Sequence, residues 1–251
     1  MVAATPPILA LYDEDISDAF EYLGLGFSRL PYWQHLLSST GAAYAGYGLG
    51  LCKNYKDADG CWRESKAMPI ETIMAVTFTD DAMIVTLSRI QSVIWLWEPS
   101  YRRHVDWALG LSRLESGDIE EKVYWSMVKE GLEQIMLDRP TFPKPEKVLL
   151  MGDRANDTRF LEALDVVLKE RLTEGKMPDI YGEDAAFVAA KGAAEMAKRS
   201  PYDLRLLSDE ESELWQMELA EQKRMSQLED ERTQFSAKHG TGSRHDTKID
   251  L

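Results

Sequence analysis

Three acidic side chains and one histidine are the residues of this sequence best suited to proton transfer. Asp80 and Asp81 are adjacent and separate two apolar stretches, Asp153 comes just after a third, and His104 lies near Tyr101. Carboxyl groups in a pair, or beside an imidazole, can act as a general acid and base or bind a metal ion. If the chain is an enzyme, its candidate catalytic residues are therefore Asp80, Asp81, His104 and Asp153. Adjacent aspartates are also typical of a plain hairpin turn, which is the favoured interpretation.

Other kinds of catalytic or metal site find little support. The two cysteines, Cys52 and Cys61, flank a polar loop, and two reduced thiols are favoured over a disulfide because the N-terminus lacks the basic region of a secretion signal. A zinc site needs four clustered ligands. The histidines do not provide them, and we predict no metal site; they are His35, His104, His239 and His245.

The charge balance narrows the class of partner. Acidic residues number 43 against 29 lysines and arginines, a net charge of −14, which argues against a protein that binds nucleic acid. No stretch approaches the roughly 18 apolar residues of a membrane span. We therefore expect a cytoplasmic protein with neither nucleic acid nor membrane as a partner. With 251 residues, 44% of them hydrophobic, the chain can form one sizeable core or two small ones.

The apolar periodicity predicts alternating strands and helices, and hence an α/β fold with a mixed sheet and flanking helices. Residues 72–79 and 82–90 are rich in β-branched side chains and predict a hairpin. Pro99 is suited to begin a helix that runs to about residue 110, and 53–67 reads as a charged loop. The other expected elements are helices at 14–30, 119–138, 156–172 and 184–199, strands at 147–151 and 178–181, and a strand or buried segment at 91–97.

Four segments follow from the changes in composition. Residues 1–40 form an N-terminal helical segment, 41–206 the α/β domain, 207–236 a charged helix, and 237–251 a disordered tail. The small residues of 41–51 and the alanine-rich segment 184–199 indicate closely packed backbones.

Three segments together resemble the ATPase domain of the actin-like and heat-shock-chaperone superfamily. Lys147-Val-Leu-Leu-Met-Gly-Asp153 is similar to the strand and turn that hold adenosine, and Ala185-Ala-Phe-Val-Ala-Ala-Lys-Gly-Ala-Ala194 to the small-residue helix that follows. Gly41-Ala-Ala-Tyr-Ala-Gly-Tyr-Gly-Leu49, with the hairpin after it, resembles the region of the second phosphate loop. The resemblance covers about residues 41–200, which correspond to the second lobe alone, and it is closest to chaperone-like proteins of filamentous fungi.

The departures from the family pattern concern phosphate binding. The segment Thr77-Phe-Thr-Asp-Asp-Ala82 stands where the family has a glycine-rich phosphate loop, and two acids replace the backbone that would approach an anion. The adenosine element keeps Gly152, has Asp153 in place of a serine, and has Arg154 one position before the usual arginine. The resemblance implies a vestigial adenosine element at Gly152, Asp153 and Arg154, and no cofactor, with an adenine nucleotide as the lesser alternative.

The resemblance implies a non-hydrolysing, degenerate chaperone-ATPase-like module that binds a protein or a small apolar ligand, with ATPase activity not expected. Two alternatives stay open. One is a small enzyme of fungal specialised metabolism, an isomerase or cyclase that uses an apolar cleft; the other is a truncated nucleotide-binding chaperone-like protein. Such a cleft could be lined by tryptophans, although core positions are the more common role for them; these are Trp95, Trp97, Trp107 and Trp125. A lone lobe would also expose a face that residues 1–40 are expected to cover.

Overall fold

The computed structural model describes residues 4–5, 13–24, 37–93, 96–136, 144–172 and 177–203. By its internal contacts the chain divides into two units, Met1–Leu204 and Arg205–Leu251, and every described residue belongs to the first. The charged helix at 207–236 and the tail at 237–251 lie outside the described residues and stay predictions. None of the described helices is long and apolar enough to cross a membrane.

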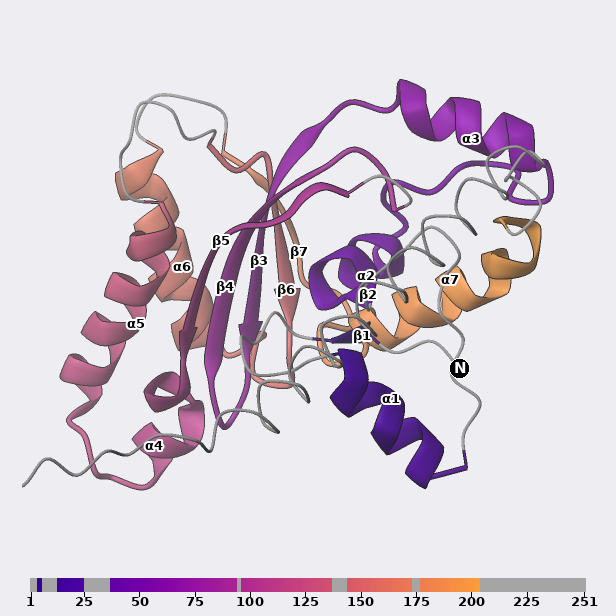
Figure 1. The fold of residues 1–251 in the computed structure, drawn as a ribbon. Helices are drawn as coiled ribbons and strands as arrows, with labels where there is room; N and C mark the ends of the chain where they lie inside the picture. The colour runs from indigo at the N-terminus through magenta and orange to yellow at the C-terminus, as the bar shows by residue number, and fades with distance from the viewer. Residues whose placement is uncertain are drawn as a thin grey trace, which may run out of the picture. The chain divides into compact units, whose positions relative to one another are not determined.

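A five-stranded mixed sheet, in the order β5-β4-β3-β6-β7, forms the centre of this unit (Figure 1). Strands β3 (Glu71–Phe78), β4 (Met83–Ile90) and β5 (Leu96–Asp106) form an antiparallel meander, and β6 (Lys147–Met151) and β7 (Asp179–Tyr181) continue it in parallel on the other side of β3. The predicted α/β class with a mixed sheet is confirmed. The predicted hairpin is confirmed within one residue at each end. Its strands are buried on both faces, and such strands are recognisable in the sequence as continuous apolar runs.

One sequence prediction near this sheet is wrong. Pro99 does not begin a helix but lies inside β5, and only the short 3-10 helix η1 (Trp107–Leu109) follows that strand. The physical reason is the position of β5 at the edge of the sheet. A proline is tolerated in an edge strand because the N–H group that it lacks would face away from the neighbouring strand and make no hydrogen bond in the sheet.

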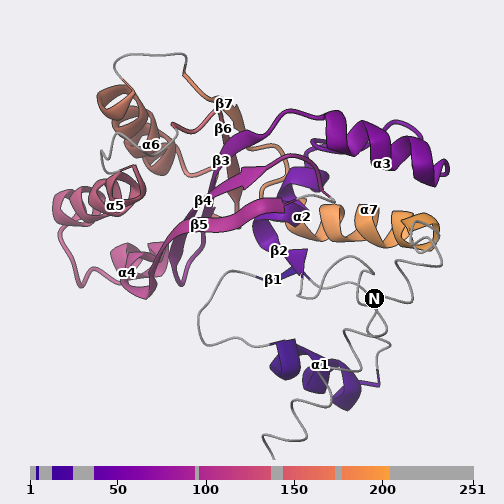
Figure 2. The ribbon, with the colours of Figure 1, turned by 45° about the horizontal axis from the view of Figure 1, so that its top comes forward.

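Two helical layers cover the two faces of the sheet (Figures 1 and 2). Helices α5 (Glu121–Ile135) and α6 (Thr158–Arg171) lie on one face, and α2 (Ser39–Gly46) and α7 (Val188–Asp203) on the other. Alternate residues of β3 enter the two cores: Met74, Val76 and Phe78 belong to the core with α5 and α6, while Ile73 and Ala75 belong to the core with α2 and α7. The sheet is therefore buried on both sides.

Helices α2 and α7 approach each other at the level of the backbone. A Cβ atom at Gly192 would overlap the carbonyl oxygen of Ala42, and one at Gly46 would overlap that of Val188. The close packing predicted for these two small-residue segments is confirmed. Together α2 and α7 cover the second face, and Ala4 and Leu37 reach the same core. Most of residues 1–40 lie outside the described residues, so the covering role expected of that whole segment stays a prediction.

The remaining described elements are short. They are β1 (Ala4–Thr5), parallel to β2 (Leu37–Ser38), and the helices α1 (Asp13–Tyr22), α3 (Ala58–Ala67) and α4 (Leu111–Glu115). Helix α3 occupies most of the stretch that was predicted to be a charged loop. It forms there because the Asp57 side chain caps its start by accepting a hydrogen bond from Gly60 N at 3.0 Å.

The two cysteines form a disulfide, so the prediction of reduced thiols is wrong. The first turn of α3 brings Cys61 back to Cys52, with their Cα atoms 5.1 Å apart, and both residues are buried.

The four tryptophans considered as cleft or core residues do not all lie in the core. The Trp107 side chain is 60% exposed, Trp125 on α5 is partly buried against the core, and Trp95 and Trp97 fall outside the described side chains.

Candidate functional site

The candidate site lies at the carboxyl ends of the parallel neighbours β3 and β6. Strand β3 ends at Phe78 and leads into the turn 79–82, while β6 ends at Met151 and leads into the turn 152–157 before α6. In open α/β sheets, ligands bind at this edge, beside the turns that follow the parallel strands. The pairing of β3 with β6 therefore brings together two of the segments that carry the family resemblance.

The turn after β3 is held by its own backbone and by α4. The Thr79 side-chain oxygen accepts hydrogen bonds from Asp81 N and Ala82 N, at 3.2 and 3.1 Å. Ser112, in the first turn of α4, donates from its backbone N–H and from its hydroxyl to the carbonyl oxygen of Asp80, at 3.0 and 2.6 Å. The amino end of α4 thus binds a carbonyl group of the turn.

The turn after β6 depends on Gly152. Its φ angle is +96°, and a Cβ atom there would overlap the carbonyl oxygen of Phe78. The Gly152 N–H donates to Ala185 O at 3.0 Å, and the Arg154 N–H donates to Phe78 O at 3.1 Å. Gly152 thereby allows close approach between the ends of β3 and β6.

An ion pair joins the two turns. Arg154 Nε donates to Asp80 Oδ1 at 2.7 Å, and Arg154 Nη2 donates to Asp80 Oδ2 at 3.2 Å. Both side chains are partly exposed, at 40% and 36%. The hydrogen bond and charge of Asp80 raise the pKa of Arg154, and Glu115 and Asp153 add to the negative field around the guanidinium. We call this bidentate pair the Asp80–Arg154 clasp.

The other predicted catalytic residues are not brought together into a proton-transfer group. Asp81 and Asp153 are exposed, and no metal-binding group of three or more His, Cys, Asp or Glu side chains forms within the described residues. His104 lies on β5 beneath α5, and a Cβ at Gly131 would stand 3.2 Å from its Nε2 atom. That nitrogen is buried and has no hydrogen-bond partner in the described part of the chain. His104 therefore belongs to the packing between sheet and helix.

The amino end of α6 is capped by Asp157, a residue that the sequence analysis did not single out. Its carboxylate accepts from the N–H groups of Arg159 at 2.9 Å and Phe160 at 3.4 Å, and binds the Arg159 guanidinium as well. The side-chain hydrogen bond from Arg159 lowers the pKa of Asp157 against the opposing effect of burial. The pattern Asp-x-x before an apolar run could have identified this cap. The amino end of α6 is thereby capped from within the chain.

Aromatic side chains fill the space beneath both turns. Phe78 stacks on Phe160 with ring centroids 4.4 Å apart, and Trp125 lies 6.4 Å from Phe78. Arg159 covers the Trp125 ring from 5.5 Å. Tyr47, on the other face, donates to Leu150 O at 2.7 Å, and burial, followed by nearby acids, raises its pKa to about 12. The two turns of the candidate site therefore lie against closely packed side chains.

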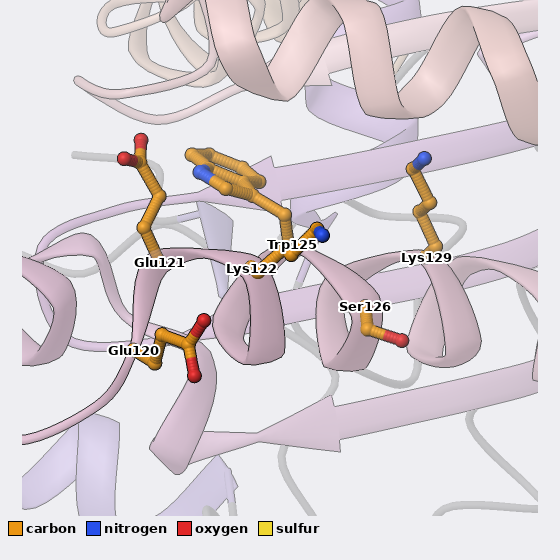
Figure 3. Close-up of a pocket in the computed structure, with 6 residues that line it drawn as sticks. All are labelled: Glu120, Glu121, Lys122, Trp125, Ser126 and Lys129. Atoms are coloured by element: carbon orange, nitrogen blue, oxygen red, sulfur yellow. The ribbon is translucent and has the colours of Figure 1, made fainter.

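A separate hollow of about 550 Å³ lies along the outer stripe of α5 (Figure 3). Its lining consists of charged and polar side chains around one indole ring: Glu120, Glu121, Lys122, Trp125, Ser126 and Lys129. None of the predicted catalytic or adenosine-element residues lines it, so the hollow does not supply the apolar cleft that an isomerase or cyclase would need.

No protein-family model and no curated protein matches this sequence. Its functional interpretation accordingly depends on the topology and on the contacts at the two turns.

Proposed function

We propose that this chain is a degenerate relative of the second lobe of actin-like, chaperone-type ATPases, which acts by binding a protein or a small ligand and does not hydrolyse ATP. The hairpin and the strand–turn–helix element that carry the resemblance are neighbours in the sheet, as a shared nucleotide-binding edge requires. The small-residue helices α2 and α7, which carry the rest of it, pack together on one face. These placements support the relationship.

The observation that carries the non-hydrolysing role is that hydrogen-bond donors at the carboxyl ends of β3 and β6 are already bound to other groups of the protein. A polyphosphate is held by backbone N–H groups, helix amino ends and basic side chains. Here the amino end of α4 binds the backbone of the β3–β4 turn, Asp157 caps α6, and Asp80 holds Arg154. The acids of the two turns would also repel the negative charges of a nucleotide. We therefore infer that the edge rejects ATP and that the scaffold serves another binding role.

The test is a titration of the purified full-length chain with Mg-ATP and Mg-ADP, followed by thermal unfolding and by phosphate release. We expect no rise in the unfolding temperature and no phosphate release above background, because a ligand stabilises a protein only by binding its folded state. Magnesium-dependent ATP turnover that disappears in an Arg154→Ala variant would overturn the proposal.

A parallel screen with a set of hydrophobic metabolites and with immobilised protein extracts tests the binding role itself. A ligand or protein that stabilises the folded chain increasingly as its concentration rises, following the logarithmic dependence of a binding equilibrium, supports the module. If one of the small molecules is instead converted to an isomer, and Asp80→Asn abolishes the conversion, the enzyme alternative replaces it.

A further inference from the structure

A basic side chain lies beside one cysteine of the disulfide, and the other cysteine belongs to the first turn of a helix. The Arg199 Nη1 atom of α7 donates to the carbonyl oxygen of Cys52 at 3.2 Å and lies 3.5 Å from Cys52 Sγ. Cys61 lies in the first turn of α3, and its N–H donates to Asp57 O at 2.8 Å. A neighbouring guanidinium and the amino end of a helix are two environments that stabilise a cysteine thiolate. Cys52 Sγ therefore has a guanidinium at 3.5 Å, and Cys61 stands near the amino end of α3.

Opposing effects are present but act less directly. Both cysteines are 4% exposed, and burial disfavours a charged sulfur. The Asp57 carboxylate caps α3 and offsets part of the helix field. Glu195 binds Arg199 through its Nε and Nη2 atoms at 3.0 and 2.9 Å, which leaves Nη1 directed at Cys52. The guanidinium thus keeps one donor for the sulfur while the others hold it in place.

We propose that Cys52–Cys61 is a redox-active disulfide, which exchanges with a dithiol reductant and whose reduced form is stabilised by Arg199. A thiolate of the dithiol attacks Cys61 Sγ, the S–S bond breaks, and Cys52 leaves with the electron pair as a thiolate beside Arg199. The second thiol of the reductant, once deprotonated, attacks the mixed disulfide and releases Cys61. The protein gains two electrons and one proton, which Cys61 takes up, while Cys52 stays a thiolate; the second proton of the dithiol goes to solvent, and the dithiol becomes a disulfide.

The exchange would change how the loop 53–60 is attached to the fold. In the oxidised chain the loop is closed covalently at both ends, and Tyr55 lies under the cationic groups of Lys198 and Arg199, at 4.9 and 5.1 Å. After reduction the cross-link between Cys52 and α3 is lost, so that only the backbone and non-covalent contacts hold the helix in place, and the Cys52 thiolate pairs with Arg199. This site is independent of the proposed function, because none of its residues belongs to the turns after β3 and β6.

The test measures the equilibrium between the full-length chain and mixtures of reduced and oxidised dithiothreitol, trapped by alkylation and quantified by mass spectrometry. At mildly alkaline pH, Arg199→Gln should shift the equilibrium about three- to tenfold toward the disulfide. Arg199→Lys should keep much of the wild-type value. The control is Lys191→Gln, which removes an exposed cation from the same helix α7 and should leave the equilibrium unchanged.

The sign of the effect separates this proposal from a purely structural role. If Arg199 only holds the loop in place, its removal loosens the loop and reduction becomes easier or stays unchanged, which contradicts the proposal. Glu195→Gln provides a second measurement that does not remove the arginine: it should shift the equilibrium at least about twofold toward the dithiol, because a charge that offsets the guanidinium is lost. No shift, or a shift toward the disulfide, also overturns the proposal.

Discussion

The neighbouring strands β3 and β6 are joined by an ion pair at each of their two ends, and the two pairs have opposite character. At the amino end, Glu71 Oε1 pairs with Lys147 Nζ, and the side chains are only 19% and 14% exposed. The Tyr44 hydroxyl donates to the other carboxylate oxygen at 2.7 Å. At the carboxyl end, the Asp80–Arg154 clasp is formed by two half-exposed side chains.

The difference in burial predicts a difference in how much each ion pair contributes to stability. A nearly buried pair leaves an uncompensated charge in the core when one partner is lost, whereas water replaces the partner of an exposed pair. The amino-end pair is therefore a structural element, with its carboxylate fully engaged. The clasp is expected to add little to folding, and in the proposed function its role is to occupy the arginine.

The largest expected effect is the loss of Lys147. Lys147→Ala leaves the Glu71 carboxylate against Tyr44 and the sheet without its cation, and we expect the free energy of unfolding to fall by about 3 kcal/mol. Urea unfolding followed by circular dichroism measures the change. The matched control is Lys169→Ala, which breaks the exposed pair with Asp165 on α6 and should cost less than about 0.5 kcal/mol. Equal losses in the two variants would remove the distinction between buried and exposed pairs.

A smaller effect is expected from Tyr44→Phe. This variant keeps the ring in the core but removes the hydrogen bond to Glu71, so the free energy of unfolding should fall by about 1.5 kcal/mol at neutral pH. Burial, followed by the hydrogen bond and charge of Glu71, raises the pKa of Tyr44 far above its ordinary value of 10.0.

The sign of this shift gives the pH dependence. Above about pH 10 the unfolded chain loses the Tyr44 proton while the folded chain keeps it, so the stabilisation from Tyr44 is complete below that pH and decreases as the pH rises. Unfolding curves at increasing alkaline pH should show the advantage of the wild type over Tyr44→Phe shrinking. Tyr47 and Tyr124, whose pKa values are also raised, are common to both proteins and cancel. An advantage that stays constant would contradict the assignment.

The sequence predicted the fold better than the contacts within it. Strands 72–79, 82–90 and 147–151 were identified because buried strands are continuous apolar runs, and a local pattern is enough to recognise them. Pro99 was misread because a proline signals a helix start or an edge strand equally well, and strand order is not a local property. Helix α3 was missed because its charged surface masks a start signal that Asp57 supplies.

The candidate site shows the same limit. Gly152, Asp153 and Arg154 were identified as a turn after a strand, and Asp80 as part of a hairpin, yet no spacing connects residues 74 positions apart. Only the parallel register of β3 and β6 brings them together. The disulfide was missed for a related reason: the eight residues between Cys52 and Cys61 are compatible with an open loop until the first turn of α3 reverses the chain.

The smallest effect on stability, and the sharpest on binding, is expected from opening the clasp. Asp80→Asn should leave the urea midpoint unchanged within error, because both side chains are solvated. It should nevertheless make the folded protein bind inorganic phosphate measurably, since Arg154 loses its charged partner while the turn keeps its backbone contacts. Isothermal titration with phosphate measures this gain, which should disappear again in Asp80→Asn/Arg154→Ala. Asp165→Asn, which neutralises the acidic partner of the exposed ion pair on α6, should gain no phosphate affinity. If Asp80→Asn destabilises the fold as much as Lys147→Ala and binds no phosphate, the clasp is a second structural pair and does not keep this edge closed to anions.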